Sequence, residues 1–258
     1  MSAGRMLGLV ALTLLASAPV AAAGSLESAI AATPDGAWLE YEVALLPGDG
    51  SPCCFDWRGG KVERRGCALD GRNWNFGTSK DHLRDSDQLR VFLRKSGGTV
   101  DRVRAVGGDC PIDTGTLDVR RIDAKADESV AVLARLAEAG HKRGEPLAAL
   151  AMHADRAATA ALERLATRGE SETRGDALFW LSQRGDADAE RIILAALAPD
   201  VPTNVQKKAI FALSQLPAER SIPALTALVE SNRPRAIRKE AMFWLAQHDS
   251  DEAFAVFD

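Results

Sequence analysis

Hydrophobic and polar side chains alternate between residues 36 and 122, which is the period of a β-strand. The alternation is clearest over residues 39–45, 89–94 and 100–106, and a further run covers residues 117–122. Ser96, Gly97 and Gly98 separate two of these runs and predict the turn of a hairpin. The pattern therefore predicts a small antiparallel β domain, with a half-buried strand over residues 39–45.

From about Asp127 the hydrophobic period becomes that of an α-helix. Asp127 is the predicted N-cap of a first helix, and Gly140 is expected to end it. One face of this helix carries Val130, Leu133, Leu136 and Ala137. No strand-like run follows, so the second half is predicted to be all α. The expected fold class is α+β, with two domains.

The helical half contains an internal repeat with a period of 32 residues. The segment 177–183 aligns without a gap with 209–215 and 241–247, and a weaker unit covers 147–165. Each unit predicts a helix, a short turn and a second helix. Its Ala and Leu positions share one face, and its Phe lies on the neighbouring flank of the same buried stripe. Because one pair of helices cannot bury its own apolar face, the units should stack into a superhelical solenoid.

The opening of the last unit, Ile237-Arg238-Lys239-Glu240-Ala241, resembles the HEAT repeat in its short bacterial form. The resemblance covers residues 145–258, although Gln206 replaces the Arg in the middle repeat, and the last repeat stops at Asp258 about one turn into its second helix. The whole chain is similar to exported bacterial proteins that join a cysteine-containing N-terminal domain to HEAT repeats. The resemblance implies a binding surface for a protein partner and implies no reaction.

The N-terminus has the features of a secretory signal peptide. Arg5 supplies the positive charge, residues 6–16 form the apolar run, and residues 21–23 offer small side chains for cleavage. Because the run is short of the roughly 20 residues that span a bilayer, a cleaved signal is favoured over an uncleaved anchor. We therefore expect a periplasmic or secreted protein that has no stable membrane insertion after cleavage.

The four cysteines, Cys53, Cys54, Cys67 and Cys110, all lie in the β half. In an oxidising compartment such a set predicts disulfides, and its spacing does not fit a metal site. A bond between the adjacent Cys53 and Cys54 would be strained. We favour Cys54 with Cys67 and Cys53 with Cys110, and the crossed pairing stays open. The expected units are a signal peptide over residues 1–23, a cystine-containing β domain over 24–124 and a solenoid of three to four repeats over 125–258.

Charge and chemistry exclude several classes of function. The net charge of -4 argues against a nucleic-acid partner. The four histidines, His82, His141, His153 and His248, form no recognisable catalytic motif, and no phosphate-binding loop occurs. We predict that the protein is not an enzyme and that it uses no cofactor and no metal.

The candidate partner-binding residues lie in the repeats. A basic cluster predicts a patch for an acidic segment, with a solvated helix start as the alternative: Lys207, Lys208, Arg233, Arg235, Arg238 and Lys239. Trp180 and Trp244 occupy equivalent positions and are either anchors for a partner or, more simply, packing between repeats. Arg174 and Arg238 are expected to brace adjacent repeats. The second helices add Arg191, Arg220 and Glu230 as exposed candidates.

The sequence favours a non-catalytic interaction scaffold that binds a protein partner through the solenoid. One alternative is a small-molecule or glycan sensor whose β domain has a pocket lined by Trp57, Trp74 or Tyr41. The least favoured alternative is a hydrolase with a dispersed site. The sequence does not indicate the partner or the oligomeric state.

Overall fold

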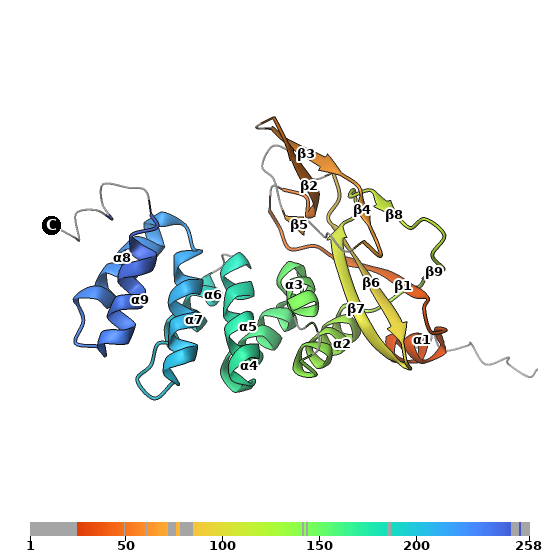
Figure 1. Cartoon of the computed structure of the whole chain (residues 1–258). Helices are drawn as coiled ribbons and strands as arrows, with labels where there is room; N and C mark the ends of the chain where they lie inside the picture. Colours follow the sequence, from red (N-terminus) through yellow and green to blue (C-terminus); the bar gives the residue numbers. More distant parts are fainter. Residues whose placement is uncertain are drawn as a thin grey trace, which may run out of the picture.

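The computed structural model describes residues 25–48, 50–59, 61–71, 76–77, 85–140, 142, 144–184, 187–248 and 253. A β-rich region occupies one end of the molecule, and most of the helices follow it in a row (Figure 1). The predicted α+β class is confirmed. The signal-peptide prediction falls on residues 1–23, which lie outside the described residues. In the part of the chain that is described, no helix is both long enough and apolar enough to cross a bilayer.

A four-stranded sheet with the order β7-β6-β1-β9 forms the centre of the β region. The predicted hairpin is confirmed as β6 and β7, and β1 pairs antiparallel to β6 from Trp38 opposite Arg94 to Ala44 opposite Gln88. The strands are β1 (Trp38–Ala44), β2 (Cys53–Arg58), β3 (Lys61–Arg65), β4 (Cys67–Ala68), β5 (Phe76–Gly77), β6 (Gln88–Ser96), β7 (Thr99–Gly107), β8 (Ile112–Asp113) and β9 (Val119–Arg121).

The prediction of a purely antiparallel β domain was too simple. β9 runs parallel to β1, and β8 runs parallel to β4. The segment after β7 crosses to the opposite edge of the sheet before β9 begins. As a result, β9 runs in the same direction as β1. The alternation of side chains indicates which residues form strands, but it carries no information about the direction of the neighbour.

Strand β1 is buried on both faces near its start, whereas the sequence predicted one buried face. Leu39 and Tyr41 pack against the helices, and Trp38 belongs to a second apolar cluster that contains the cysteines. Glu40 is also buried on this second side, where Arg90 and Arg121 contact its carboxylate at 2.8 and 3.0 Å. The hydrophobic–polar alternation of β1 predicted too little burial of this strand, because a second layer covers the other face of the sheet.

Two disulfides hold this second layer together. Cys53 is bonded to Cys110 and Cys54 to Cys67, which confirms the favoured pairing. All four cysteines are buried, and the sulfurs of Cys67 and Cys110 lie 3.7 Å apart. The cystine cluster packs with Trp38 and Phe92 on the face of the sheet that the helices do not cover.

The helices form two layers. The first layer contains α3 (Gly144–Met152), α5 (Ser171–Arg184), α7 (Thr203–Ser214) and α9 (Arg235–Leu245). The second contains α2 (Ala126–Glu138), α4 (Arg156–Arg168), α6 (Ala187–Ala195) and α8 (Ala218–Glu230). Residues at the same position of the 32-residue repeat, Ala177, Ala209 and Ala241, are fully buried between helices. One apolar core runs from the sheet through these layers.

The ends of the helical row differ in detail from the sequence prediction. The N-cap of α2 is Lys125, so the prediction of Asp127 as the N-cap was wrong by two residues. Asp127 lies in the first turn, where its negative charge interacts favourably with the helix dipole. Gly140 has a φ of 77° after the end of α2, as expected for a residue that ends a helix. A short helix that the sequence pattern did not reveal, α1 (Leu26–Ala32), packs on α2 and is joined to it by an ion pair of Glu27 with Arg135.

Gly175 of α5 lies directly under the side chain of Lys208, which comes from α7. A Cβ atom at this position would overlap the aliphatic part of Lys208, which crosses α5 here to reach Glu172. A glycine inside a helix costs roughly 1 kcal/mol relative to alanine.

Candidate functional site

Five aromatic side chains form a continuous strip along the first helix layer. Phe179 of α5 stacks on Phe211 of α7 with ring centres 5.7 Å apart, and Phe211 contacts Trp244 of α9 at 4.7 Å. Trp180 and Phe243 extend the strip through edge-on contacts with Phe179 and Trp244. We call Phe179, Trp180, Phe211, Phe243 and Trp244 the aromatic strip.

The strip becomes more exposed toward α9. Phe243 is 54% exposed and the neighbouring Met242 is 43% exposed, whereas Phe179 and Phe211 are half-buried. The sequence placed the repeated Phe on the flank of a buried stripe, and for Phe243 this was wrong. Phe243 lies in the last described helix of the first layer, so among the described helices no further one follows to cover it. The sequence did contain one signal for the strip, because this phenylalanine recurs with the 32-residue period of the repeat.

The two tryptophans of the strip are partly packed in the core and partly exposed at the surface. Both are half-buried and pack against the main core, and Trp244 donates a hydrogen bond from its indole nitrogen to Glu240 at 3.1 Å. The equivalent position of the middle repeat is Ala212, which is fully buried. The packing interpretation of Trp180 and Trp244 is therefore consistent with the structure, and a role in partner binding stays a prediction.

The predicted basic cluster divides into two groups. Lys207 pairs with Glu240 at 3.4 Å and Lys208 with Glu172 at 2.7 Å, so both lysines link neighbouring helices. Arg233 donates a hydrogen bond to the carbonyl of Leu197. Exposed cations at the start of α9 form the second group: Arg235, Arg238 and Lys239. Because Lys239 lies four residues before Phe243, positive charge adjoins the exposed end of the aromatic strip.

The predicted bracing role differs among the three repeats. Arg174 donates a hydrogen bond to the carbonyl of Ala166 at the end of α4, so it joins two helices as expected. Gln206, at the equivalent position, reaches the carbonyl of Val201. Arg238 is exposed, and no bracing contact of its side chain is seen among the described residues.

The second helix layer carries a ladder of ion pairs between successive helices. Its pairs are Glu138 with Arg164 at 3.6 Å, Glu163 with Arg191 at 3.3 Å, and Glu190 with Arg220 at 3.1 Å. Arg191 and Arg220, which the sequence offered as exposed candidates, therefore connect neighbouring helices. Exposed pairs of this kind contribute little to stability, typically about 0 to 1 kcal/mol each.

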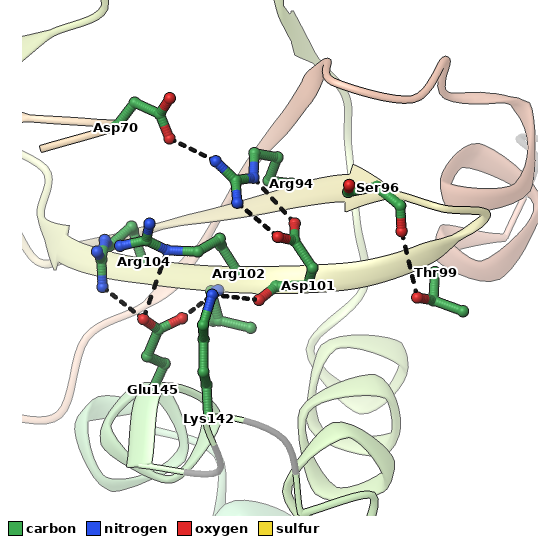
Figure 2. Close-up of polar contacts among 10 residues, drawn as sticks. Asp70, Arg94, Ser96, Thr99, Asp101, Arg102, Arg104, Lys142 and Glu145 are labelled. Carbon is green, nitrogen blue, oxygen red and sulfur yellow. Dashed lines mark hydrogen bonds and ion pairs between the residues drawn. The ribbon is translucent and has the colours of Figure 1, made fainter. Parts of the chain in front are cut away.

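Where the sheet meets the helices, cationic side chains cluster around Glu145. Arg104 contacts the Glu145 carboxylate at 2.8 Å and Arg102 approaches it at 3.7 Å, while the amide of Val103 donates to it at 2.8 Å. Figure 2 shows this carboxylate pointing at both guanidinium groups, with Lys142 beside it. Arg104 is only 6% exposed. Burial lowers the pKa of Arg104, and the adjacent Arg102 acts in the same direction against the favourable charge of Glu145.

A second group of charges continues this cluster on β6. Arg94 contacts Asp101 and Asp70, at 2.5 and 2.6 Å. The hydrogen bonds from Arg94 hold the pKa of Asp101 below its ordinary value. Nothing in the sequence pattern pointed to this network, because its members come from the segment after β4, from β6 and β7, and from the residues at the start of α3.

An open hollow of about 350 Å³ lies beside this cluster. Residues 103–105 of β7 form one wall, and Glu145, Ala148 and Met152 of α3 form another. Trp180, the end of the aromatic strip, closes the third side. We call this space the junction hollow. It has apolar walls with one charged rim, a composition typical of binding pockets.

The other sequence candidates lie elsewhere. Tyr41 is fully buried, hydrogen-bonded to Ser129, and burial raises its pKa, so it lines no open pocket. Trp74, His82 and His141 lie outside the described residues, as does the side chain of Trp57. His248 contacts the hydroxyl of Ser221 at 3.1 Å, and this contact joins α8 to the end of α9.

His153 is fully buried between the end of α3 and the end of β1, where it forms an isolated bridge with Leu45. Its Nδ1 accepts a hydrogen bond from the amide of Asp155, and its Nε2 has no hydrogen-bond partner among the described residues. Burial lowers the pKa of His153 from its ordinary value of 6.5, and Arg184 adds to this effect. The charge of Asp155 opposes this lowering of the pKa, and the net effect is that His153 binds a proton less readily in the folded protein than in the unfolded chain.

We expect acid to destabilise the protein through His153. Because its pKa is lower in the folded state, the unfolded chain binds the proton first, so stability is lost as the pH falls below about 6.5. His153→Asn keeps an acceptor for the Asp155 amide and cannot titrate. Urea unfolding at pH 7.5 and 5.5 should show a smaller acid loss for His153→Asn than for the unchanged protein. Equal losses would contradict the assignment.

The comparison with known families agrees with the helical architecture. Residues 158–246 match the family model of HEAT repeats, which confirms the predicted resemblance for this segment. The segment includes α5 to α9 and so contains the whole aromatic strip. No curated protein matches the chain significantly. HEAT repeats generally mediate contacts between proteins.

Proposed function

We propose that this protein is a non-catalytic interaction scaffold of the periplasm or cell envelope. The observation that carries the proposal is the aromatic strip, whose end at Phe243 and Met242 is exposed within a HEAT-repeat segment. Large apolar side chains at a surface lose their contact with water when a partner covers them, and such contacts dominate binding energies. The predicted superhelical stacking of the repeats would present the strip along one side of the helical row.

The charges around the strip favour a particular kind of partner. Lys239 is exposed four residues before Phe243, and Arg235 and Arg238 are exposed earlier in the same helix. Cations at the rim of an apolar surface attract and orient an acidic segment, mainly through faster association. The proposed partner segment therefore combines apolar anchors with acidic side chains.

Export of the protein rests on two features of the chain. The predicted signal peptide over residues 1–23 would direct it across the inner membrane. Two buried disulfides are typical of proteins that fold in an oxidising compartment. These features support a location in the cell envelope for the interaction.

The test is cross-linking mass spectrometry of the tagged protein in its own cell envelope. Phe243→Asp should reduce the recovery of a recurrent partner by about tenfold or more, because a charge would replace an apolar anchor. Cross-links to that partner should involve Lys207 or Lys239.

Leu194→Asp is the matched control for this test. Leu194 is 43% exposed, but it lies on α6 in the other helix layer. This variant should retain the partner. A partner that both variants keep, or that both lose equally, would contradict the assignment of the strip as the binding surface.

A further inference from the structure

The outward face of α9 carries contact residues that the preceding helix of the first layer uses to hold its neighbour. Helices α8 and α9 form the end of the helical row away from the β region (Figure 1). Within the first layer, α5 contacts α7 and α7 contacts α9. These two junctions therefore show what a further helix placed against α9 would need.

At the junction of α7 and α9, one ion pair and one ring contact lie a turn apart. Lys207 pairs with Glu240 at 3.4 Å, and the ring centres of Phe211 and Trp244 are 4.7 Å apart. From the first contact to the second, both helices advance by four residues, so they run in the same direction. The indole nitrogen of Trp244 also donates to the Glu240 carboxylate at 3.1 Å. Glu240 and Trp244 thus contact α7 as one unit, with the acid at position i and the ring at i+4.

The junction of α5 and α7 follows the same rule with the charges reversed. Lys208 of α7 pairs with Glu172 at 2.7 Å, and Phe211 stacks on Phe179 with ring centres 5.7 Å apart. In both junctions the incoming helix brings a charge opposite to the one that the preceding helix presents. Three or four residues later it brings a ring that contacts the repeated phenylalanine.

Helix α9 presents the receiving half of this contact, and no further helix covers it among the described residues. Lys239 lies 32 residues after Lys207 in the sequence, and Phe243 follows Phe211 by the same interval. Lys207 and Phe211 are half-buried because α9 lies against them, whereas Lys239 and Phe243 are exposed. In the part of the chain that the structure describes, Lys239 forms no ion pair. Met242 adds a second exposed apolar side chain next to Phe243.

Charge selects among the possible occupants of this face. Arg235 and Arg238 are exposed in the same helix as Lys239. Glu240 is the one acidic residue of α9, and it is engaged by Lys207. Two copies of this chain that met through their α9 faces would bring like charges together, which is unfavourable. An acidic helix of another protein would be attracted.

We propose that the outward face of α9 binds a helix of a partner protein that carries a carboxylate at position i and an aromatic ring at i+4. This helix would run parallel to α9 and continue the first layer. Its carboxylate would pair with Lys239, its ring would lie on Phe243 and Met242, and a second carboxylate one turn earlier would lie beside Arg235. The proposal rests on the scaffold function and specifies the partner of that surface.

The probe is a fluorescein-labelled helix based on α9 with the cations removed, and its sequence is Pro-Ala-Glu-Ile-Gln-Gln-Glu-Ala-Gln-Ala-Trp-Leu-Ala-Gln. A hydrocarbon staple between the first and third glutamine positions keeps it helical, because isolated helices of this length are marginal in water. Fluorescence polarisation with the full chain should show saturable binding. Replacing the tryptophan by alanine should weaken binding by about tenfold or more, because the ring supplies the apolar anchor.

Charge reversal tests the register of the two helices. Lys239→Glu should weaken binding of the probe by about tenfold, because an attraction is replaced by a repulsion. A probe whose second glutamate is replaced by lysine should bind Lys239→Glu more tightly than it binds the unchanged protein. Arg156→Glu is the matched control, since Arg156 is an exposed cation on α4 in the other helix layer, and it should leave binding unchanged.

The proposal is overturned if the probe does not bind, if the alanine probe binds as well as the parent, or if the lysine probe gains nothing from Lys239→Glu. Self-association of the chain that Phe243→Asp abolishes would also overturn it, because a second copy would then occupy the face.

The cross-linking experiment separates this failure from failure of the scaffold function. A partner that is lost with Phe243→Asp but recovered fully with Lys239→Glu would leave the scaffold surface valid and would remove only the acidic helix proposed for it. A partner that Phe243→Asp retains would contradict the scaffold surface, whatever the probe does.

Discussion

Removing the disulfide between Cys53 and Cys110 is expected to lower the free energy of unfolding by about 4 kcal/mol. These cysteines are separated by 57 residues, so the bond restricts a long segment of the unfolded chain. The double variant Cys53→Ala with Cys110→Ala tests this without placing a hydroxyl in the buried cluster. The measurement is equilibrium unfolding in guanidinium chloride, with the second disulfide verified by mass spectrometry.

The second disulfide provides an internal comparison. Cys54 and Cys67 are separated by only 13 residues, so the matching double variant should lose about 3 kcal/mol. Both bonds lie in the same apolar cluster, and the loss of buried contacts should therefore be similar in the two cases. A greater loss for the shorter loop would contradict the explanation through chain entropy and would point to packing of the sulfurs.

Glu145→Ala is expected to lower the free energy of unfolding by about 2 to 3 kcal/mol. The substitution leaves Arg102 and Arg104 close together without the carboxylate between them, and removes the acceptor of the Val103 amide. Loss of one partner of a fully buried pair costs about 3 to 5 kcal/mol. The side chain of Glu145 is 21% exposed, so solvent screening places its cost below that range.

Glu163→Ala is the control for this prediction. Glu163 also pairs with an arginine, Arg191, but both side chains are largely exposed. Its removal should change the free energy of unfolding by less than about 1 kcal/mol. Urea unfolding of both variants at one pH gives the comparison. Equal effects of the two substitutions would show that the junction cluster contributes no more to stability than a surface ion pair.

The sequence alone determined the elements whose signals are local. The alternation at residues 89–106 predicted the hairpin of β6 and β7, and the period of 32 residues predicted the stacked helix pairs. It also favoured the correct disulfide pairing, because a bond between adjacent cysteines is strained and Gly59 and Gly60 can turn the chain from Cys54 back toward Cys67. These features follow from side-chain periodicity and covalent geometry within short stretches of chain.

Only the tertiary structure decided which of these elements contact one another. The direction of β9, the exposure of Phe243 and the cluster of Arg102 and Arg104 around Glu145 all depend on which elements become neighbours. Periodicity shows which face of an element is apolar, but whether that face or edge is covered depends on segments distant in the sequence, and only packing in three dimensions brings those segments together.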